Sequence, residues 1–217
     1  MADLTSEKIA SLRKNYTQAG LPDKGVPKQP MELFKKWLKE ALESDVLEPN
    51  AMVVSTVDAN GYPNSRTVLL KGVHDETIRF FTNYGSVKGE EISQNNHISV
   101  VFWWGELERQ VRIRGVAERI SEKESSDYFH SRPRDSRIGA WASSQSNEVS
   151  GREVLEERFR EVKEKYSGKK IPKPPFWGGF DISIHEIEFW QGRPGRLHDR
   201  IKYTKSNSNW QSKRLAP

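Results

Sequence analysis

The sequence contains no cysteine among its 217 residues, which excludes disulfides, thiolate metal sites and thiol catalysis. No apolar run approaches the roughly 20 residues that a membrane-spanning helix needs. Residues 1–10 carry acidic side chains and lack the apolar stretch of a signal peptide, so a secretory leader is not expected. These absences predict a cytoplasmic protein that has no membrane partner.

A large excess of charge of one sign is also lacking. The 35 lysines and arginines are offset by 30 aspartates and glutamates, and no block of like charge forms a tail. The arginines fall on expected loops and helix ends rather than along a strand face with aromatic platforms, which does not favour a nucleic-acid-binding barrel. Histidine pairs at metal-ligand spacing and a G-x-S-x-G nucleophile elbow are missing too. We therefore expect no nucleic acid, no metal and no hydrolase chemistry.

Helical periodicity is confined to the start of the chain and a few later segments. Residues 5–16 have the spacing of a short amphipathic helix, and the three prolines of residues 21–30 mark a linker. Pro30 suits the first position of a second helix. The expected buried stripe of that helix consists of Phe34, Trp37, Leu38, Ala41 and Leu42.

From residue 51 the hydrophobic period becomes that of strands. Strands are expected at residues 52–57, 65–70, 78–82, 98–104 and 109–118, with two more at 182–190 and 201–204. Their close spacing and hairpin-like turns favour an antiparallel barrel over βαβ units. Ser86, and capping boxes that begin at Ser121 and Ser150, each predict the start of a helix. The expected fold class is mainly β with peripheral helices.

The connection between the last two expected strands concentrates groups suited to a planar, phosphorylated ligand. Trp190 offers a flat ring, Arg196 and Arg200 offer guanidinium forks, and His198 offers a proton near neutral pH. Connections on a rigid scaffold are common places for sites. The same residues also fit an ordinary charged hairpin loop, so this stretch alone does not decide between the two.

Three other segments carry groups suited to anions. Arg66 and Lys71 flank an apolar strand, and Lys88 follows Ser86 at an expected helix start, where backbone N–H groups favour an anion. Residues 128–136 crowd hydroxyls and arginines at the end of a helix. Each segment has an ordinary alternative: solvent-facing strand ends, a helix start without a glycine-rich loop, and a helix end with favourable cations.

Together these segments resemble the pyridoxine (pyridoxamine) 5′-phosphate oxidase family, in order, from about residue 10 to the last residue. The segments that carry the resemblance are Arg66-Thr67-Val68-Leu69-Leu70-Lys71, Tyr128 through Ser136 (YFHSRPRDS), Ile138-Gly139-Ala140-Trp141, Gln145-Ser146, Phe176-Trp177-Gly178-Gly179, Glu188-Phe189-Trp190-Gln191-Gly192, Arg196-Leu197-His198-Asp199-Arg200 and Arg214-Leu215-Ala216-Pro217. No single segment is decisive, but chance agreement of all of them is negligible.

The resemblance implies an FMN-binding split β-barrel that forms a homodimer with FMN at the subunit interface. Residues 31–217 would form the oxidase domain, and residues 1–30 would cover the active site. The implied reaction oxidises the phosphorylated B6 vitamers pyridoxine 5′-phosphate and pyridoxamine 5′-phosphate to pyridoxal 5′-phosphate, with O2 as electron acceptor and H2O2 released, in vitamin B6 biosynthesis and salvage. Another split-barrel flavoprotein, a flavin reductase or a non-catalytic flavin binder, is the alternative.

The resemblance also implies roles by position. The FMN-binding residues would be Arg66, Thr67, Val68, Leu69, Leu70, Lys71, Phe81, Thr82, Val87, Lys88, Gln110, Gln145, Ser146, Trp190 and Arg200. The substrate-binding residues would be Lys71, Tyr128, Arg132, Ser136, Arg196, Leu197 and His198. The catalytic residues would be Arg196 and His198, which would flank the reacting ring, with Arg13 and Tyr16 helping to cover it.

Two positions depart from the family pattern. The family usually has arginine immediately before the lysine of the FMN-phosphate segment, where this chain has Val87. Losing one charge-assisted contact is expected to cost about 1.5–3 kcal/mol of FMN affinity, unless Arg66 and Lys88 compensate. Phe81 replaces the tyrosine of some members, which removes a hydroxyl and keeps the ring.

Overall fold

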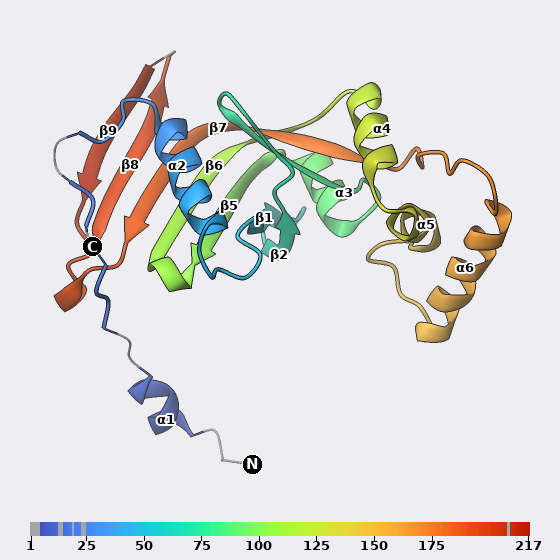
Figure 1. Cartoon of the computed structure of the whole chain (residues 1–217), viewed down its shortest axis with the longest axis horizontal. Coiled ribbons are helices and arrows are strands. Elements are labelled where there is room, and N and C mark those ends of the chain that lie inside the picture. Colours follow the sequence, from blue (N-terminus) through green and yellow to red (C-terminus); the bar gives the residue numbers. More distant parts are fainter. Residues whose placement is uncertain (1–4, 13–14, 19, 23–24, 208) are drawn as a thin grey trace. The chain divides into compact units, whose positions relative to one another are not determined.

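The computed structural model describes residues 5–12, 15–18, 20–22, 25–207 and 209–217. Figure 1 shows the helices and strands along the chain. They form two compact units. The central unit comprises residues 50–102 and 113–185, and the terminal unit comprises residues 1–49, 103–112 and 186–217.

The central unit is built on an antiparallel sheet with the strand order β2-β1-β5-β6-β7-β4-β3. The strands are β1 Ala51–Val57, β2 Pro63–Leu69, β3 Gly72–His74, β4 Thr77–Asn83, β5 His97–Trp104, β6 Arg109–Arg119 and β7 Trp177–Gln191. Strands β5, β6 and β7 continue into the terminal unit. Strand β2 stands at the end of this order, and its side chains are mostly exposed or half-buried.

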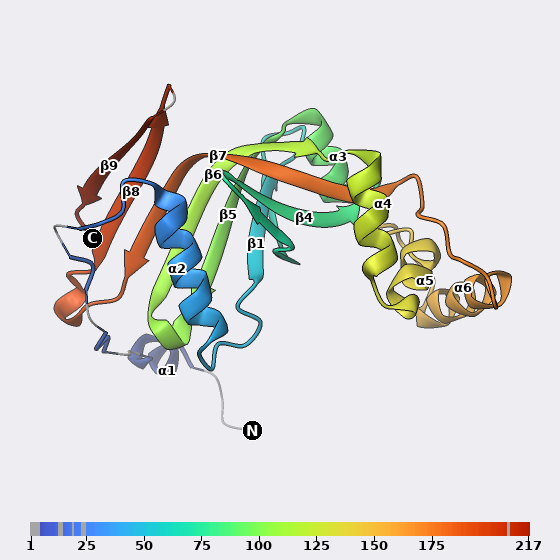
Figure 2. The same cartoon turned by 45° about the horizontal axis from the view of Figure 1, so that its top comes forward.

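Four helices accompany this sheet in the part of the central unit that the structure describes. They are α3 Val87–Gln94, α4 Glu122–Ser131, α5 Arg134–Ala142 and α6 Arg152–Lys165. Helix α4 lies beside the start of β7, and α5 and α6 follow it farther from the strand (Figures 1 and 2). Helix α3 follows β4 directly, so the end of β4 and the start of α3 lie together.

Polar caps fix the starts of α3 and α4, as the sequence predicts. The Ser86 hydroxyl accepts a hydrogen bond from the Gly89 amide at 3.4 Å. Ser121 and Glu124 form both halves of a capping box, which satisfies amide groups that the first helical turn leaves without partners. These two predicted starts are confirmed.

The expected capping box at the start of α6 is wrong. The helix begins at Arg152, so Gly151 rather than Ser150 occupies the capping position, and no side chain caps it. Glu153 then stands two positions after the cap instead of three, which is too close for the reciprocal bond of a capping box.

Alternating burial along the strands makes the core of the central unit. Ile78, Phe80 and Thr82 of β4 are buried, and so are Ile113 and Ala117 of β6. A second buried cluster joins α4, α5 and the start of β7; its members are Phe129, Ile138, Ile171 and Trp177, and Phe159 and Val162 of α6 pack against it. This second cluster holds α4 and α5 in place.

The terminal unit contains α1 Ser6–Ser11, α2 Pro30–Leu42, β8 Asp199–Ser206 and β9 Asn209–Leu215, with short 3-10 turns at Gly105–Leu107 and Pro194–Arg196. Strand β8 pairs antiparallel with both β7 and β9. Helix α2 buries Met31, Leu33, Phe34, Trp37 and Ala41. The Trp37 ring meets Phe189 of β7 edge-on, with ring centroids 5.3 Å apart.

Several sequence expectations need correction. The first helix ends at Ser11 rather than near residue 16, and it lacks the expected apolar packing face, since Ile9 and Leu12 are exposed and no residue of α1 is buried. Leu42 is 61% exposed, so it lies outside the buried stripe of α2. Helix α5 and strands β3 and β9 are not among the expected elements.

The predicted fold class, mainly antiparallel β with peripheral helices, is confirmed. Among the helices within the described ranges, none is both long enough and apolar enough to cross a membrane.

Candidate active site

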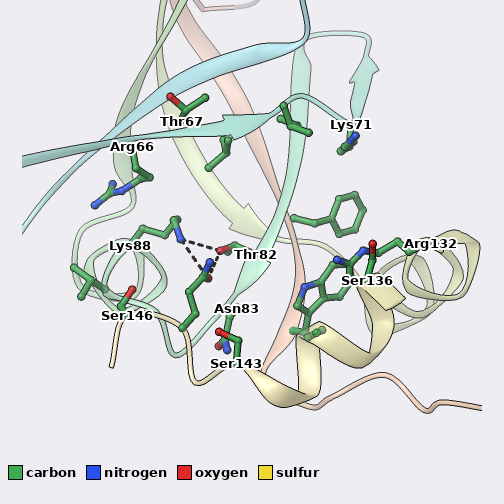
Figure 3. Close-up of a pocket in the computed structure, with 18 of the residues that line it drawn as sticks. Arg66, Thr67, Lys71, Thr82, Asn83, Lys88, Arg132, Ser136, Ser143 and Ser146 are labelled. Atoms are coloured by element: carbon green, nitrogen blue, oxygen red, sulfur yellow. Dashed lines mark hydrogen bonds between the residues drawn. The ribbon is translucent and has the colours of Figure 1, made fainter. Parts of the chain in front are cut away.

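The central unit contains a cavity of about 910 Å³, within the range typical of small-molecule sites. Figure 3 shows Lys88 and Arg132 on opposite sides of it. The predicted site residues that line it are Arg66, Thr67, Val68, Leu69, Lys71, Phe81, Thr82, Val87, Lys88, Tyr128, Arg132, Ser136, Gln145 and Ser146. The cavity therefore gathers four segments that are far apart in the sequence.

Some predicted and lining residues do not coincide. Leu70 is buried and does not line the cavity; its amide donates to the Asn50 carbonyl at 2.8 Å. The lining residues without a predicted role are Asn64, Ser65, Asn83, Gly139, Ala140, Ser143 and Trp177. Of these, Trp177 stands in the Phe-Trp-Gly-Gly segment that carries part of the family resemblance, so the sequence pointed to its segment without giving Trp177 a role.

The α3 end of the cavity, formed by Thr82, Lys88 and Gln145, presents a buried ammonium group. Lys88 Nζ donates to Thr82 Oγ1 at 3.2 Å, to Ser86 Oγ at 3.3 Å and to Gln145 Oε1 at 3.4 Å. All three acceptors are uncharged. Burial, reinforced by the nearby Arg66 charge, lowers the pKa of Lys88 below its usual value. An anion at this end would meet a desolvated cation without a partner carboxylate among the described residues.

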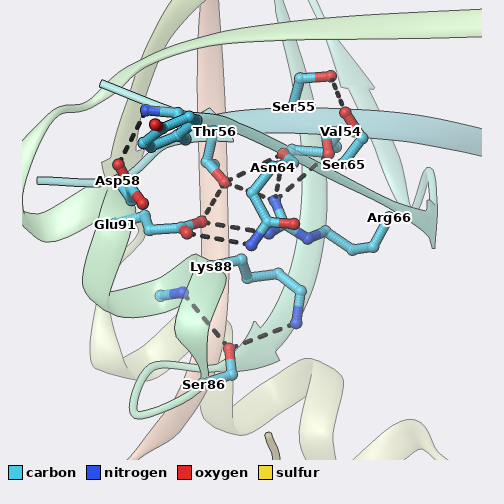
Figure 4. A network of polar contacts seen from close by, with 12 residues as sticks. Val54, Ser55, Thr56, Asp58, Asn64, Ser65, Arg66, Ser86, Lys88 and Glu91 are labelled. Carbon is cyan, nitrogen blue, oxygen red and sulfur yellow. Dashed lines mark hydrogen bonds and ion pairs between the residues drawn. The ribbon is translucent and has the colours of Figure 1, made fainter. Parts of the chain in front are cut away.

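Arg66 lines the same end but already has a charged partner (Figure 4). Its Nη2 donates to Glu91 Oε2 at 3.1 Å, and its Nη1 donates to the Thr56 hydroxyl and to the Asn64 carbonyl at 3.1 Å. Glu91 also accepts from the Thr56 hydroxyl and from Asn64 Nδ2. Burial alone would raise the pKa of Glu91, but the hydrogen bonds from Thr56, Asn64 and Arg66 together lower it. Glu91 is therefore a charged, fixed partner of Arg66.

The α4 end of the cavity, formed by Tyr128, Arg132 and Ser136, combines stacked rings with a second cation. The Tyr128 ring stacks on Phe81 with centroids 3.8 Å apart, and the Arg132 guanidinium lies 4.7 Å from the Trp177 ring centroid. Arg132 Nη1 is buried and has no hydrogen-bond partner in the described part of the chain. Burial lowers the pKa of Arg132 and raises that of Tyr128. A buried guanidinium donor without an acceptor calls for an anionic ligand.

The terminal unit holds a separate group of predicted residues, the Trp190 cluster of Tyr16, Trp190 and His198. The Trp190 and His198 ring centroids are 4.7 Å apart, and the Tyr16 ring meets both edge-on at 5.5 and 5.4 Å. His198 Nδ1 accepts a hydrogen bond from the Arg193 amide at 3.1 Å. Arg196, two residues before His198, is exposed and has φ of 60°, a strained conformation that is common at functional sites.

The remaining predicted residues also lie in the terminal unit. Arg200 donates from Nε to Glu188 Oε1 at 2.9 Å, and this hydrogen bond raises its pKa. Gln110 is half-buried on β6, and Leu197 is 74% exposed. Arg13 lies outside the described residues. The described ranges contain no group of three or more histidine, aspartate or glutamate side chains placed to hold a metal.

Comparison with known proteins identifies the family. Residues 38–166 match the family described as pyridoxamine 5′-phosphate oxidase, and residues 177–217 match the pyridoxine 5′-phosphate oxidase C-terminal dimerisation region. Proteins named pyridoxine/pyridoxamine 5′-phosphate oxidase from Cyanothece sp. and Microcystis aeruginosa are 49% and 50% identical to this chain. Each alignment covers 96% of this chain and 98% of the relative.

Solved structures agree with this assignment. PhzG from Burkholderia lata, in complex with tetrahydrophenazine-1-carboxylic acid, superposes with a TM-score of 0.84 at 31% identity, covering 88% of this chain and 94% of PhzG. A pyridoxamine 5′-phosphate oxidase-related, FMN-binding protein from Nostoc punctiforme gives 0.67 at 16% identity, covering 89% and 100%, and supports the fold alone. The chain belongs to the pyridoxamine 5′-phosphate oxidase family.

Proposed function

We propose that this protein is an FMN-dependent oxidase that converts pyridoxine 5′-phosphate and pyridoxamine 5′-phosphate to pyridoxal 5′-phosphate. The observation that supports it most is the pair of anion receptors in one cavity. Within the described residues, Lys88 at the α3 end has only neutral acceptors, and Arg132 at the α4 end has a buried donor without a partner. A phosphorylated cofactor beside a phosphorylated substrate requires two such receptors.

The α3 end suits the phosphate of FMN. Lys88 supplies a desolvated positive charge, and the hydroxyls of Thr82 and Ser86 are already within hydrogen-bond distance of it. Charge-assisted hydrogen bonds to a phosphate are stronger than those between neutral groups. Val87 also lines the cavity and is 42% exposed, so it contributes an aliphatic surface and no charge.

The α4 end suits the phosphate of the substrate. Arg132 offers a rigid fork of donors, Ser136 and Tyr128 offer hydroxyls, and Lys71 adds a cation from the connection between β2 and β3. The Trp177 ring under the guanidinium fixes its plane without neutralising its charge. This cluster distinguishes a phosphorylated substrate from an uncharged one.

The redox chemistry comes from the cofactor. Lys88, Thr82 and Ser86 would hold the phosphate of FMN, and the bound flavin would supply a hydride acceptor for the C4′ carbon and a route for two electrons and two protons to O2, giving H2O2. The alcohol substrate loses its hydroxyl proton as the aldehyde forms. The amine substrate gives an imine, which water hydrolyses to the aldehyde and ammonia. No other oxidant is needed for either substrate.

The terminal unit supplies the remaining groups in this proposal. Arg196 and His198 orient the C4′ group and stabilise the charge that develops as hydride leaves, and Trp190, Arg200 and Gln110 contact the flavin. The match of residues 177–217 to a dimerisation region supports a homodimer. We place FMN at the subunit interface, so that one cofactor is served by both protomers.

The likeness to PhzG favours a second candidate, a flavin-dependent oxidation of a carboxylated aromatic substrate. PhzG was solved with tetrahydrophenazine-1-carboxylic acid, and Arg132 would accept a carboxylate as well as a phosphate. The 49–50% identity to proteins named pyridoxine/pyridoxamine 5′-phosphate oxidase exceeds the 31% identity to PhzG. We therefore rank the B6 substrates first.

The test is the visible spectrum of the protein reconstituted with FMN and kept free of oxygen. Addition of pyridoxine 5′-phosphate should bleach the flavin, and air should restore the oxidised spectrum. Unphosphorylated pyridoxine at the same concentration is the matched control and should bleach it far more slowly. A bound flavin that stays oxidised with both B6 phosphates, or that is bleached by the phenazine acid alone, would contradict the proposal.

A further inference from the structure

Glu108 binds the backbone of the segment that carries Tyr16. The segment, residues 15–18 and 20–22, is called the N-terminal strap here. Glu108 Oε2 accepts hydrogen bonds from two consecutive strap amides, those of Thr17 at 2.9 Å and Gln18 at 3.1 Å. A carboxylate that accepts from two backbone amides makes charge-assisted bonds, which are stronger than bonds between neutral groups.

Glu108 is itself fixed to the end of β7. Its residue is 2% exposed, and its backbone adopts φ of 53° immediately before β6. Its carbonyl oxygen accepts from the Gly192 amide at 2.7 Å and from Gln191 Nε2 at 3.1 Å. The carboxylate therefore holds the strap at a defined place beside the residues that follow Trp190.

Tyr16 directly precedes the two residues whose amides Glu108 binds, and it belongs to the Trp190 cluster. Its ring packs edge-on against both Trp190 and His198. A Cβ atom at position 192 would lie 2.8 Å from Tyr16 Cγ, so Gly192 leaves the space that the Tyr16 ring requires. The position of this ring depends on where the strap backbone is held.

A second anchor holds the other end of the strap. Asp199 Oδ2 accepts from the Leu21 amide at 2.9 Å, and Arg214 Nη2 donates to the Leu21 carbonyl at 3.1 Å. Arg193 Nη1 donates to the Gln18 carbonyl at 3.3 Å. These contacts hold the strap from the Gln18 carbonyl onward, whereas Glu108 holds the amides of the two residues that follow Tyr16.

We infer that Glu108 is a positioning residue of the active site. It holds the Tyr16 ring in contact with Trp190 and His198. It acts through Tyr16 and touches no reacting group. The consequence for catalysis rests on the proposed function, because it requires His198 to face the B6 substrate. Loss of Glu108 should weaken substrate retention and leave the hydride-transfer groups in place.

The experiment compares Glu108→Ala and Glu108→Gln in the full-length, FMN-loaded protein, with Glu106→Ala as the matched control. Glu106 is an exposed carboxylate two residues away. In Glu108→Ala the Thr17 and Gln18 amides should exchange hydrogen about tenfold faster, and KM for pyridoxine 5′-phosphate should rise about tenfold with kcat within about twofold. Glu108→Gln should lie between, because its amide oxygen still accepts a hydrogen bond. Glu106→Ala should match the wild type.

A double-mutant cycle separates positioning from general structural damage. Tyr16→Ala should raise KM to a similar extent, and adding Glu108→Ala to it should produce little further change, since both act through one ring. Additive effects would overturn the inference. So would unchanged exchange at Thr17 and Gln18, or faster exchange with unchanged KM. If the wild type oxidised no B6 substrate, the proposed function would fail, while the amide exchange would still decide whether Glu108 holds the strap.

Discussion

Lys88 and Arg66 lie at the same end of the cavity but differ in what already engages them. Arg66 is bound to Glu91, to the Thr56 hydroxyl and to backbone carbonyls, whereas the acceptors of Lys88 among the described residues are all neutral. A phosphate would have to compete with a buried carboxylate for Arg66. Lys88 therefore carries most of the charge that a phosphate would meet here. Compensation by Arg66 for the phosphate contact that Val87 lacks stays a prediction.

Replacing Lys88 should separate phosphate recognition from flavin recognition. Lys88→Met keeps the length of the side chain and removes the charge, so FMN affinity should fall about 10- to 150-fold. Riboflavin, which lacks the phosphate, should bind both proteins with similar affinity. Quenching of flavin fluorescence measures both ligands, and Lys123→Met, at an exposed lysine, is the matched control. An equal loss for riboflavin would mean that Lys88 acts on the shape of the cavity rather than on the phosphate.

The reciprocal change tests the departure from the family pattern at position 87. Val87→Arg adds a guanidinium next to Lys88 on a residue that is 42% exposed, so it can be accommodated without burial of a new charge. FMN affinity should rise about tenfold, with riboflavin affinity unchanged. Unchanged FMN affinity would show that Lys88 and its neighbours already saturate the phosphate.

The lowered pKa of Lys88 gives FMN binding a definite pH dependence. Burial favours the neutral amine, so Lys88 loses its proton below its usual pKa of 10.5. A phosphate prefers the ammonium, and FMN affinity should therefore fall as pH rises through this lowered pKa. The stability of the FMN-free protein should change in the opposite direction: between the lowered pKa and 10.5 the unfolded chain binds more protons, so stability rises with pH. The check is to measure FMN affinity and the free energy of urea unfolding as functions of pH in the wild type and in Lys88→Met. The variant should lack the contribution of Lys88 to both pH dependences.

At the scale of elements, helix α4 begins at a capping box and ends at the residues that line the α4 end of the cavity. Ser121 and Glu124 cap its start, Tyr128 lies on it, and Arg132 follows its last residue. The Glu124 carboxylate accepts from Ser121 and from Arg79, and these bonds lower its pKa to about 2. The capping box therefore keeps its charged form over the whole range in which the protein would be assayed.

Removal of this cap should loosen α4 without changing any residue that lines the cavity. Ser121→Ala should reduce the free energy of unfolding by about 1 kcal/mol, measured by urea denaturation. Ser150→Ala is the matched control and should be nearly neutral, because Ser150 does not cap α6. Equal effects of the two changes would contradict the assignment of caps.

In the wild type, the contribution of the charged Glu124 to the free energy of unfolding is present above its ordinary pKa of 4.5 and is lost as pH falls toward 2.

The elements that sequence reasoning found are those with strong local patterns. Strands β1, β2, β4, β5, β6, β7 and β8 and helices α2, α3 and α4 combine clear periodicity with caps or turns. Helix α5 begins after Pro133 and contains Gly139, and only Ile138 and Ala142 of it are buried, so tertiary packing rather than its own pattern holds it. Strand β9 has a mostly exposed, polar sequence and depends on its pairing with β8.

The site could be predicted only in part for a related reason. Resemblance supplied most of the residues that line the cavity, but it gave no indication that Arg66 is bound to Glu91. That carboxylate stands 25 positions later and reaches Arg66 because α3 packs against the sheet. Such a pairing has no local pattern in the sequence, and the same holds for the contact between Glu108 and the Thr17 amide, 91 positions apart.

At the scale of the whole molecule, the predicted site residues are divided between the two units. The cavity with Lys88 and Arg132 belongs to the central unit, and Trp190, Arg196 and His198 belong to the terminal unit. The terminal group also falls within residues 177–217, which match a dimerisation region. A homodimer with FMN at its interface would allow one site to take its phosphate receptor from one protomer and its His198 from the other.

Mixed dimers test this arrangement directly. Lys88→Met and His198→Ala should each be nearly inactive alone at limiting FMN. If one site takes Lys88 and His198 from different protomers, a mixed dimer contains one site with both lesions and one with neither. Randomly reassociated protomers should then recover about a quarter of wild-type activity, since half of the dimers are mixed and half of their sites are intact. If both residues came from one protomer, every site would keep a lesion. Mixing would then restore nothing, and FMN would not be shared in the way proposed.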